Sequence, residues 1–245
     1  MNSLVFNFNT NISGLSIPKN LNNPFESFVP EIGRIAAAEF QDFIDTESKN
    51  WGYDFSTQRG KMFGVLVVEK PDGSLGYLRT MSGVFPGGKT CEKFVPSVFD
   101  ESKTDFYLTK GMTELTEIGN AIKKSSSQKE INEFTDLRKQ KSHDLQKWLF
   151  EQYVFTSSSG KSKNVTNIFS GSKHGNPPAA TGECAAPKLL QYAFSNSLKP
   201  IALAEFWWGN ESKSRERKHL SFYPACEDKC RPLLVFMLGE NDFFW

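Results

Sequence analysis

Three of the four cysteines of this 245-residue chain lie in its last quarter, at Cys184, Cys226 and Cys230. Each falls at or near the start of a predicted helix, where exposed backbone N–H groups and the helix dipole lower the pKa of a thiol. Thiolates are preferred ligands of tetrahedral zinc. The sequence therefore predicts a zinc site at these cysteines, with His219 or His174 as a candidate fourth ligand. Ordinary buried thiols and a redox disulfide are the alternatives.

A second pattern that could carry chemistry is the glycine-rich segment GVFPGGKT at residues 83–90, which matches the phosphate-loop motif. That motif binds phosphate only where a parallel strand leads into it and a helix begins at its end. Here the preceding residues include the polar Arg79 and Thr80, and Pro96 interrupts the segment that follows. We expect a glycine-rich turn here, and no cofactor-binding residue is predicted.

Basic side chains gather in two places that could contact RNA. Residues 123–147 carry seven Lys or Arg against four Asp or Glu, and a second basic stretch lies near residue 215. A solvated helix face is the alternative explanation. Trp207 and Trp208 could offer a stacking face to a base, although strand tryptophans more often belong to the core. The candidate phosphate contacts are Arg138, Lys139, Lys141, Lys213, Arg215, Arg217 and Lys218.

The elements that position these residues begin with a helix and a hairpin. Apolar residues recur at helical spacing over residues 30–45. Two β-rich runs within residues 60–83 flank the sequence PDGS, whose Pro and Gly favour a tight turn. The first run is apolar at nearly every position, which is typical of a strand buried on both faces. The charged segment of residues 112–155 has the spacing of two antiparallel helices.

The cysteine-bearing part of the chain follows a stretch rich in Ser, Gly, Lys and Asn, residues 157–180, which predicts a linker or long loop. Residues 184–196 then predict a helix and residues 201–208 a buried strand. A final helix is expected to open near Ala225 and to carry two of the cysteines. The order in this region is therefore helix, strand, helix.

Composition limits the class of protein. The chain has 29 basic and 28 acidic residues and a formal charge of +1. Composition alone therefore predicts no non-specific binding of polyanions. Its apolar runs are shorter than the roughly 18 residues of a membrane helix, and no signal peptide is visible, so we expect a cytoplasmic protein. The expected divisions are an irregular arm (1–30), core helix and hairpin (31–84), helical insertion and linker (85–180), core helix-strand-helix (181–238) and tail (239–245).

This order of elements resembles the fold of zinc-dependent nucleoside and nucleobase deaminases. The resemblance implies an α/β fold: a deaminase-like core of helix, hairpin, helix, strand and helix, with a large helical insertion. In deaminases a Glu two residues after the first zinc ligand moves the protons. Ala186 occupies that place here, which leaves Glu183 and Glu205 as the candidate catalytic residues. A zinc-dependent deaminase-like enzyme is therefore one alternative for the function.

A wider resemblance covers roughly residues 35–238. The segments GKMFGVLVVEKPDGSLGYL, MSGVF, FVPSVFD, GMTELTEI, TGECAAPKLLQYAF, LKPIALAEFWWG and FYPACEDKC together resemble the N-terminal region of a subgroup of RluA-type RNA pseudouridine synthases. That region precedes a catalytic domain with an Arg-Leu-Asp motif, which this sequence lacks. The resemblance implies an accessory module in RNA modification that binds RNA, associated with a separate or missing isomerase domain. An interaction-only domain without RNA or metal is the remaining alternative.

Overall fold

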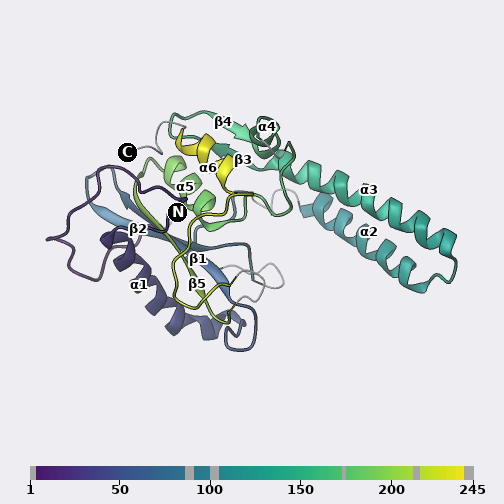
Figure 1. The fold of residues 1–245 in the computed structure, drawn as a ribbon, viewed down its shortest axis with the longest axis horizontal. Helices are drawn as coiled ribbons and strands as arrows, with labels where there is room; N and C mark the ends of the chain where they lie inside the picture. Colours follow the sequence, from purple (N-terminus) through teal and green to yellow (C-terminus); the bar gives the residue numbers. More distant parts are fainter. Residues whose placement is uncertain (1–3, 86–90, 100–104, 173–174, 212–215, 240–245) are drawn as a thin grey trace.

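The fold is mixed α/β with a small antiparallel sheet. The computed structural model describes residues 4–85, 91–99, 105–172, 175–211 and 216–239. Strand β1 (Lys61–Glu69) lies in the centre of the sheet, between β2 (Leu75–Met81) and β5 (Lys199–Trp208). Figure 1 shows this sheet at the heart of the molecule, with a pair of long helices projecting from one side.

The hairpin predicted for residues 60–83 is confirmed. β1 and β2 are antiparallel, with Val65 opposite Arg79. The turn between them closes through the backbone N–H of Lys70, which donates to the carbonyl oxygen of Ser74 at 2.8 Å. Gly73 adopts a φ of 80°, a left-handed conformation that glycine enters without steric cost. β5 pairs with the other edge of β1, also antiparallel.

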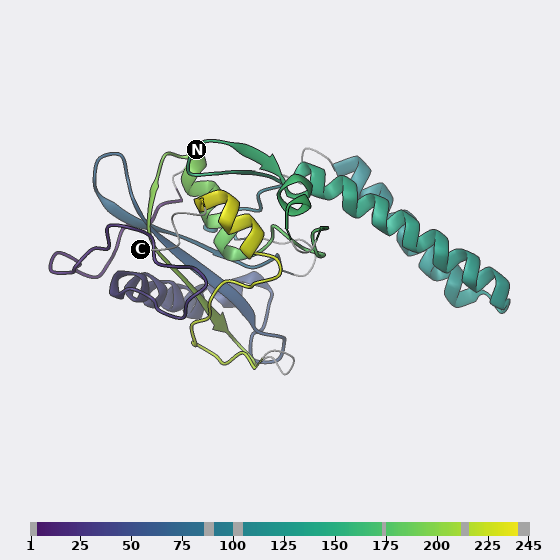
Figure 2. The same ribbon diagram turned by 45° about the horizontal axis from the view of Figure 1, so that its top comes forward.

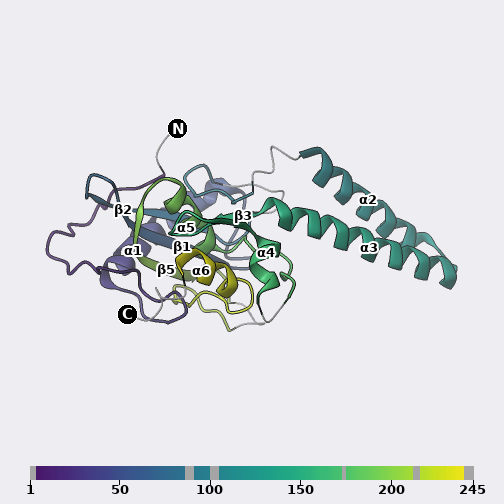
Figure 3. The same ribbon diagram turned by 90° about the horizontal axis from the view of Figure 1, so that it is seen from above.

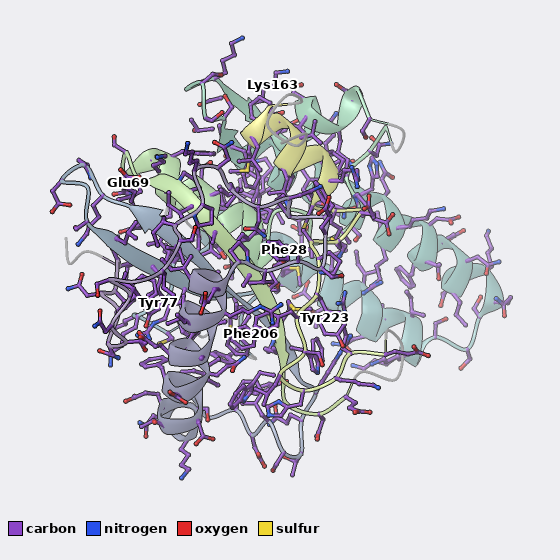
Figure 4. All side chains as sticks on the ribbon, turned by 60° about the vertical axis from the view of Figure 1, so that its left-hand side comes forward. Phe28, Glu69, Tyr77, Lys163, Phe206 and Tyr223 are labelled. Carbon is purple, nitrogen blue, oxygen red and sulfur yellow. The ribbon has the colours of Figure 1, made fainter. Side chains whose placement is uncertain are left out.

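The central strand is buried on both faces, as its unbroken apolar sequence predicts. Side chains alternate along a strand, so Phe63 and Val65 face one side, where helix α1 (Glu31–Glu47) packs, and Leu66 faces the other. Tyr77 and Phe206 belong to the α1 side, and Figure 4 labels both near this helix. α1 begins after Pro30, close to the expected start.

Two helices cover the opposite face of the sheet. They are α5 (Ala185–Ser195) and α6 (Arg231–Leu238), and their leucines join the second core cluster. Figure 2 shows both lying across the sheet from α1, which gives three layers. The predicted helix and strand around Cys184 are thus confirmed as α5 and β5. The last helix starts later than expected, at Arg231 instead of near Ala225.

The helical insertion forms an antiparallel pair, as predicted. Helices α2 (Asp105–Lys124) and α3 (Gln128–Gln152) run side by side and extend away from the sheet (Figure 3). The side chain of Ser127 caps α3 by accepting from the backbone N–H of Glu130. Among the described residues, no helix is long and apolar enough to cross a membrane.

The linker predicted for residues 157–180 was partly wrong. A two-stranded sheet joins β3 (Val154–Thr156) to β4 (Ser162–Asn164), and α4 (Val165–Ser170) follows directly. The side chain of Asn164 caps α4, and Val165 and Phe169, four residues apart, are fully buried. This apolar pair on one helical face explains why a polar segment folds onto the core.

The N-terminal segment is irregular, as expected, but it is attached to the sheet. Phe6 and Tyr77 exchange two backbone hydrogen bonds, of 2.9 and 2.8 Å. On the other edge, the side chain of Asn22 accepts from the backbone N–H of Leu203 at 2.8 Å and donates to its carbonyl oxygen at 3.1 Å. The segment therefore satisfies backbone groups that the sheet edges leave open.

Candidate metal centre

The three clustered cysteines meet at one point. The sulfur atoms of Cys184, Cys226 and Cys230 all lie within 4.8 Å of one another, and the last two are 3.3 Å apart. Sulfurs that share a tetrahedral zinc at about 2.3 Å per bond are about 3.8 Å apart. The group could therefore hold a metal ion after small adjustments of the three side chains, in which Cys226 and Cys230 move slightly apart. Within the described residues, no other group of His, Cys, Asp or Glu side chains has this geometry.

Cys184 is placed by the start of α5, of which it is the N-cap residue. The hydroxyl of Ser82, just after β2, accepts from the backbone N–H of Ala185 at 3.2 Å. The helix start approaches β1 closely because Gly64 has no side chain: a Cβ there would lie 2.8 Å from the Cβ of Ala185. Gly64 thus allows Cys184 to reach the sheet surface.

Cys226 and Cys230 lie on a turn before α6, which corrects the prediction that the helix itself carries them. The backbone N–H of Cys230 donates to the carbonyl oxygen of Cys226 at 3.2 Å, and α6 starts at Arg231. Pro232 is in the first helical turn, where its missing N–H costs nothing, and this favours a helix start at that point. Both cysteines consequently project from a compact turn beside Cys184.

Hydrogen bonds between the thiols shift their pKa values in opposite directions. Hydrogen bonds from Cys184 and Cys230, with backbone N–H groups of the turn, lower the pKa of Cys226. The pKa of Cys184 is raised, chiefly by its hydrogen bond with Cys226, and that of Cys230 is raised, chiefly by its hydrogen bond with Cys184. The lowered pKa favours the thiolate form at Cys226.

All three cysteines line one cavity of about 210 Å³, which Glu205 also lines. Glu205 is buried in β5 and points to the α5 side of the sheet, where its carboxylate accepts from the backbone N–H of Ala186 at 3.3 Å. Burial, followed by the charge of Cys226, raises the pKa of Glu205 to about 7. A carboxyl group that exchanges protons near neutrality thus adjoins the cysteines.

Glu183, the other candidate catalytic residue, is held away from this cavity. Its carboxylate accepts hydrogen bonds from the hydroxyls of Tyr153 and Ser97, the latter at 2.9 Å, and lies 3.7 Å from the ammonium of Lys188. It lines a different cavity, of about 560 Å³, at the foot of the α2–α3 pair. Although Glu183 is adjacent to Cys184 in sequence, the structure brings Glu205 to the cysteines in its place.

Among the residues that the structure describes, no histidine joins the three cysteines. The Nδ1 atom of His219 accepts from the backbone N–H of Gly209 at 3.0 Å, and its ring lies edge-on to Trp208. The structure does not place His219 in the group of metal-binding atoms. This hydrogen bond to Nδ1 holds the imidazole ring of His219 next to the end of β5. His174 lies outside the described residues.

The predicted RNA contacts are dispersed. Arg138 and Lys139 are exposed on α3, while Lys141 pairs with Glu114 at 2.7 Å. Residues 105–152 carry eight basic and eight acidic side chains, so the basic excess of the arm is only local. Arg217 lines the cysteine cavity. Lys218 is exposed, and Lys213 and Arg215 lie outside the described residues.

The two tryptophans at the end of β5 differ in exposure. Trp207 is 6% exposed and its indole N–H donates to the carbonyl oxygen of Asn210 at 2.8 Å. It also lines the cysteine cavity. Trp208 is half-buried and contacts His219. Trp207 is therefore a core residue, the alternative that strand tryptophans favour.

The glycine-rich segment has the setting of a turn. The strand that leads into it, β2, is antiparallel to β1, and residues 91–99 contain no helix. Gly83 has a φ of 70°, as a turn glycine does. Residues 86–90 of the motif lie outside the described residues.

Two charged residues of the cavity were missed from the sequence. Arg59, in the loop before β1, and Lys229, directly before Cys230, both line the cavity. Lys229 could have been suspected because it lies between the two cysteines of the turn, whereas Arg59 carries no sequence signal. In comparisons with known proteins, no protein-family model, curated protein or solved structure matched the chain.

Proposed function

We propose that this chain is a zinc-binding α/β module that contacts RNA and works alongside an RNA pseudouridine synthase, without isomerase chemistry of its own. The observation that carries the proposal is the convergence of three cysteine sulfurs, from two separate segments, on one cavity. Cys184, Cys226 and Cys230 would hold the zinc, with its fourth position toward the cavity. A reducing compartment such as the cytoplasm keeps such thiols available for metal.

Zinc fits this set of thiolate donors, whereas magnesium and calcium do not. Soft thiolates select zinc, copper(I) or iron–sulfur clusters, whereas magnesium and calcium require oxygen ligands. Hydrogen bonds from the other two cysteines lower the pKa of Cys226, which favours the thiolate that a zinc ligand requires. Once bound, zinc would fasten α5 to the turn before α6 and add to the folding free energy.

The link to pseudouridine synthesis is supported by the location of the resembling segments. Every described residue that lines the cavity, except Arg59 and Arg217, belongs to one of the segments that resemble the synthase N-terminal region. These segments supply Met62, Ser82 and the three cysteines. The deaminase-like arrangement has similar support, since Cys184 begins one helix and the other two cysteines precede the next across a shared strand.

Metal analysis of the purified protein tests the zinc centre. We expect about one zinc per chain, lost in Cys184→Ser and Cys226→Ser. Cys91→Ser is the matched control because Cys91 lies outside the cluster; it should retain the metal. Zinc below about a tenth of an equivalent in the wild type would refute the centre.

Filter binding with single-stranded RNA over a salt series tests the proposed contact with RNA. A phosphate contact releases counterions, so the affinity must fall as salt rises. RNA binding that weakens as the salt concentration rises supports the proposed RNA-contacting role. Zinc-loaded protein that retains no RNA at low salt would instead be an interaction-only domain.

A zinc-dependent deaminase is the second candidate, favoured by one contact. Ala186 occupies the place of the deaminase Glu, and its backbone N–H donates to the carboxylate of Glu205. A carboxylate thus reaches the same helix start from the neighbouring strand. Bound zinc supplies Lewis acidity at its open position. Glu205 would take the proton of a water whose oxygen joins the ring carbon, then pass it to the amine that leaves as ammonia.

Ammonia release separates the two candidates. Cytidine, adenosine and short single-stranded RNA are incubated with the zinc-loaded protein and with Glu205→Gln. Release by the wild type that the variant abolishes, at equal zinc content, would establish the enzyme. No release from any of the three substrates would leave the accessory module.

A further inference from the structure

Positive charge surrounds the cavity that the cysteines line. Arg59, Arg217 and Lys229 all line it, and they come from the loop before β1, the segment after β5 and the cysteine turn. Glu205 is the one carboxylate among the described lining residues. Three thiolates around a divalent ion leave one negative charge, so these cations exceed the negative charge even when Glu205 is ionised. We call the three residues the cation ring.

Arg217 is held in place by an aromatic ring. Its guanidinium lies over Tyr223, 4.0 Å from the ring centroid. Tyr223, labelled in Figure 4 beside β5, is itself fixed because its backbone N–H donates to the carbonyl oxygen of Glu205 at 3.0 Å. Its hydroxyl accepts from the backbone N–H of Lys218 at 2.7 Å. Arg217 is therefore held against Tyr223, whose backbone is bonded to Glu205, a residue that lines the cavity.

The backbone at Arg59 is fixed against the end of β5. The hydroxyl of Tyr53 donates to the carbonyl oxygen of Arg59. The side-chain amide of Asn210 donates to two carbonyl oxygens of the same loop, at 2.8 and 3.1 Å. Gly60 approaches Trp207 so closely that a Cβ would lie 2.5 Å from the indole nitrogen. The loop is thus tied to the strand that carries Glu205.

We propose that the cation ring binds the phosphates of single-stranded RNA while one unpaired base enters the cavity toward the cysteines. The proposal rests on the proposed RNA-contacting zinc module and locates its RNA site. The cavity, about 210 Å³, is smaller than the roughly 300 to 1,000 Å³ of sites for drug-sized ligands. It admits a single ring system and excludes a duplex. Unpaired bases can leave the stack, and guanidinium groups bind phosphate through paired hydrogen bonds.

The charges of the helical arm favour the cavity over the arm as the RNA site. Acidic and basic residues balance along α2 and α3, and Lys141 is neutralised by Glu114 at 2.7 Å. The arm therefore offers interspersed charges of both signs, whereas the cavity combines three cations with one carboxylate. The arm has a recess of its own, of about 300 Å³, but Glu114 and Asp144 line it together with Lys110 and Lys141, so its charges cancel.

Fluorescence anisotropy with a short labelled single-stranded RNA, on zinc-loaded protein at several salt concentrations, tests the site. The variant Arg59→Gln/Arg217→Gln/Lys229→Gln should bind about tenfold more weakly or worse. Its salt slope should fall by about 2, since each phosphate contact on a single strand contributes about 0.7. The matched control Lys123→Gln/Lys124→Gln/Lys129→Gln removes equal charge from exposed positions near the arm tip and should change the affinity less than about twofold.

A rival variant, Arg138→Gln/Lys139→Gln/Lys141→Gln, decides between cavity and arm. A loss in this variant as large as or larger than that of the cation-ring variant would overturn the proposal, as would normal RNA binding without the ring. Zinc content serves as the folding check for every variant. Zinc-free wild-type protein, or wild-type protein that binds no RNA, would instead refute the proposed function itself, so the two failures are distinguishable.

Entry of the base is tested by cobalt(II), which occupies thiolate zinc sites and absorbs visible light according to its ligand geometry. The same RNA should alter the cobalt spectrum of the wild type, and inorganic phosphate should not. An unchanged spectrum with saturating RNA would refute base entry. Equal displacement of RNA by inorganic phosphate and by cytidine monophosphate would also refute it, because the site would then read phosphate alone.

Discussion

The backbone N–H of Ala186 donates a hydrogen bond to the carboxylate of Glu205 at 3.3 Å. Ala186 is in the first turn of α5, where backbone N–H groups lack partners within the helix, and Glu205 is 19 residues further along, in β5. The strand therefore provides the acceptor that a capping side chain normally supplies. Because the acceptor comes from another element, the helix start depends on the strand whose Glu205 also lines the cysteine cavity.

We expect Glu205→Gln to preserve this arrangement, because a carboxamide oxygen also accepts a hydrogen bond. Its free energy of unfolding at neutral pH should equal or slightly exceed that of the wild type, since no buried charge remains. Glu205→Leu leaves the N–H of Ala186 unpaired, at a cost of about 1 to 3 kcal/mol. Urea unfolding measures all three proteins. Equal stability of the Gln and Leu variants would show that the bond does not hold the helix start.

Gly64→Ala should weaken the metal centre without touching a cysteine. The added Cβ would lie 2.8 Å from the Cβ of Ala185, so the start of α5 must move away from β1 and take Cys184 with it. We expect a loss of about 1 to 3 kcal/mol in stability and weaker zinc binding, measured by competition with a chelator. Gly171→Ala, at an open position, is the control. Zinc affinity that falls equally in both variants would contradict this account.

Lys188 holds the beginning of α5 to the loop after β2. Its ammonium is 3% exposed, donates to the carbonyl oxygen of Gly83 at 3.2 Å and lies 3.7 Å from Glu183. Burial lowers its pKa, although the charge of Glu183 opposes the shift. Lys188→Met leaves the Glu183 carboxylate without its cation and should cost about 2 to 4 kcal/mol, measured by urea unfolding.

An exposed ion pair provides the comparison for Lys188. Lys199 and Glu69 are 2.9 Å apart with side chains 59% and 36% exposed. Solvent screens such a pair, so Lys199→Met should change the free energy of unfolding by less than about 1 kcal/mol. If both Lys variants lose the same stability, burial of the Lys188 ammonium is not the cause.

Tyr77 should make stability fall at alkaline pH. Burial raises the pKa of Tyr77 to about 12, with the Glu39 carboxylate adding to the shift and Arg79 opposing it. In the unfolded chain a tyrosine titrates near about 10. From about pH 10 to 12 the unfolded chain therefore loses this proton first and becomes favoured.

Tyr77→Phe removes this contribution to the pH dependence. Between about pH 9 and about pH 11.5 the wild type should lose about 1 to 2 kcal/mol more stability than the variant. Urea unfolding at both pH values measures the difference, and other titrating groups cancel in the comparison. Parallel pH profiles for the two proteins would contradict the raised pKa.

Local signals were sufficient to predict much of the fold. The hairpin follows from apolar runs around the sequence PDGS, and the paired helices α2 and α3 follow from apolar spacing. Where the decisive contacts were remote, prediction failed. The sequence predicts a linker where α4 lies, because the apolar residues of α4 become informative only when the core receives them. It predicts too early a start for α6, because Cys226 fits a helical pattern equally well.

The sequence by itself determined which residues could bind a metal, since thiolate chemistry belongs to cysteine wherever it lies. Only the tertiary structure decided which carboxylate joins them. Glu183 is next to Cys184 in sequence yet turns toward Tyr153, whereas Glu205 faces the cavity because side chains alternate along β5 and its register places it opposite Gly64. Strand pairing and helix packing set these directions, and neither is encoded in the spacing of residues along the chain.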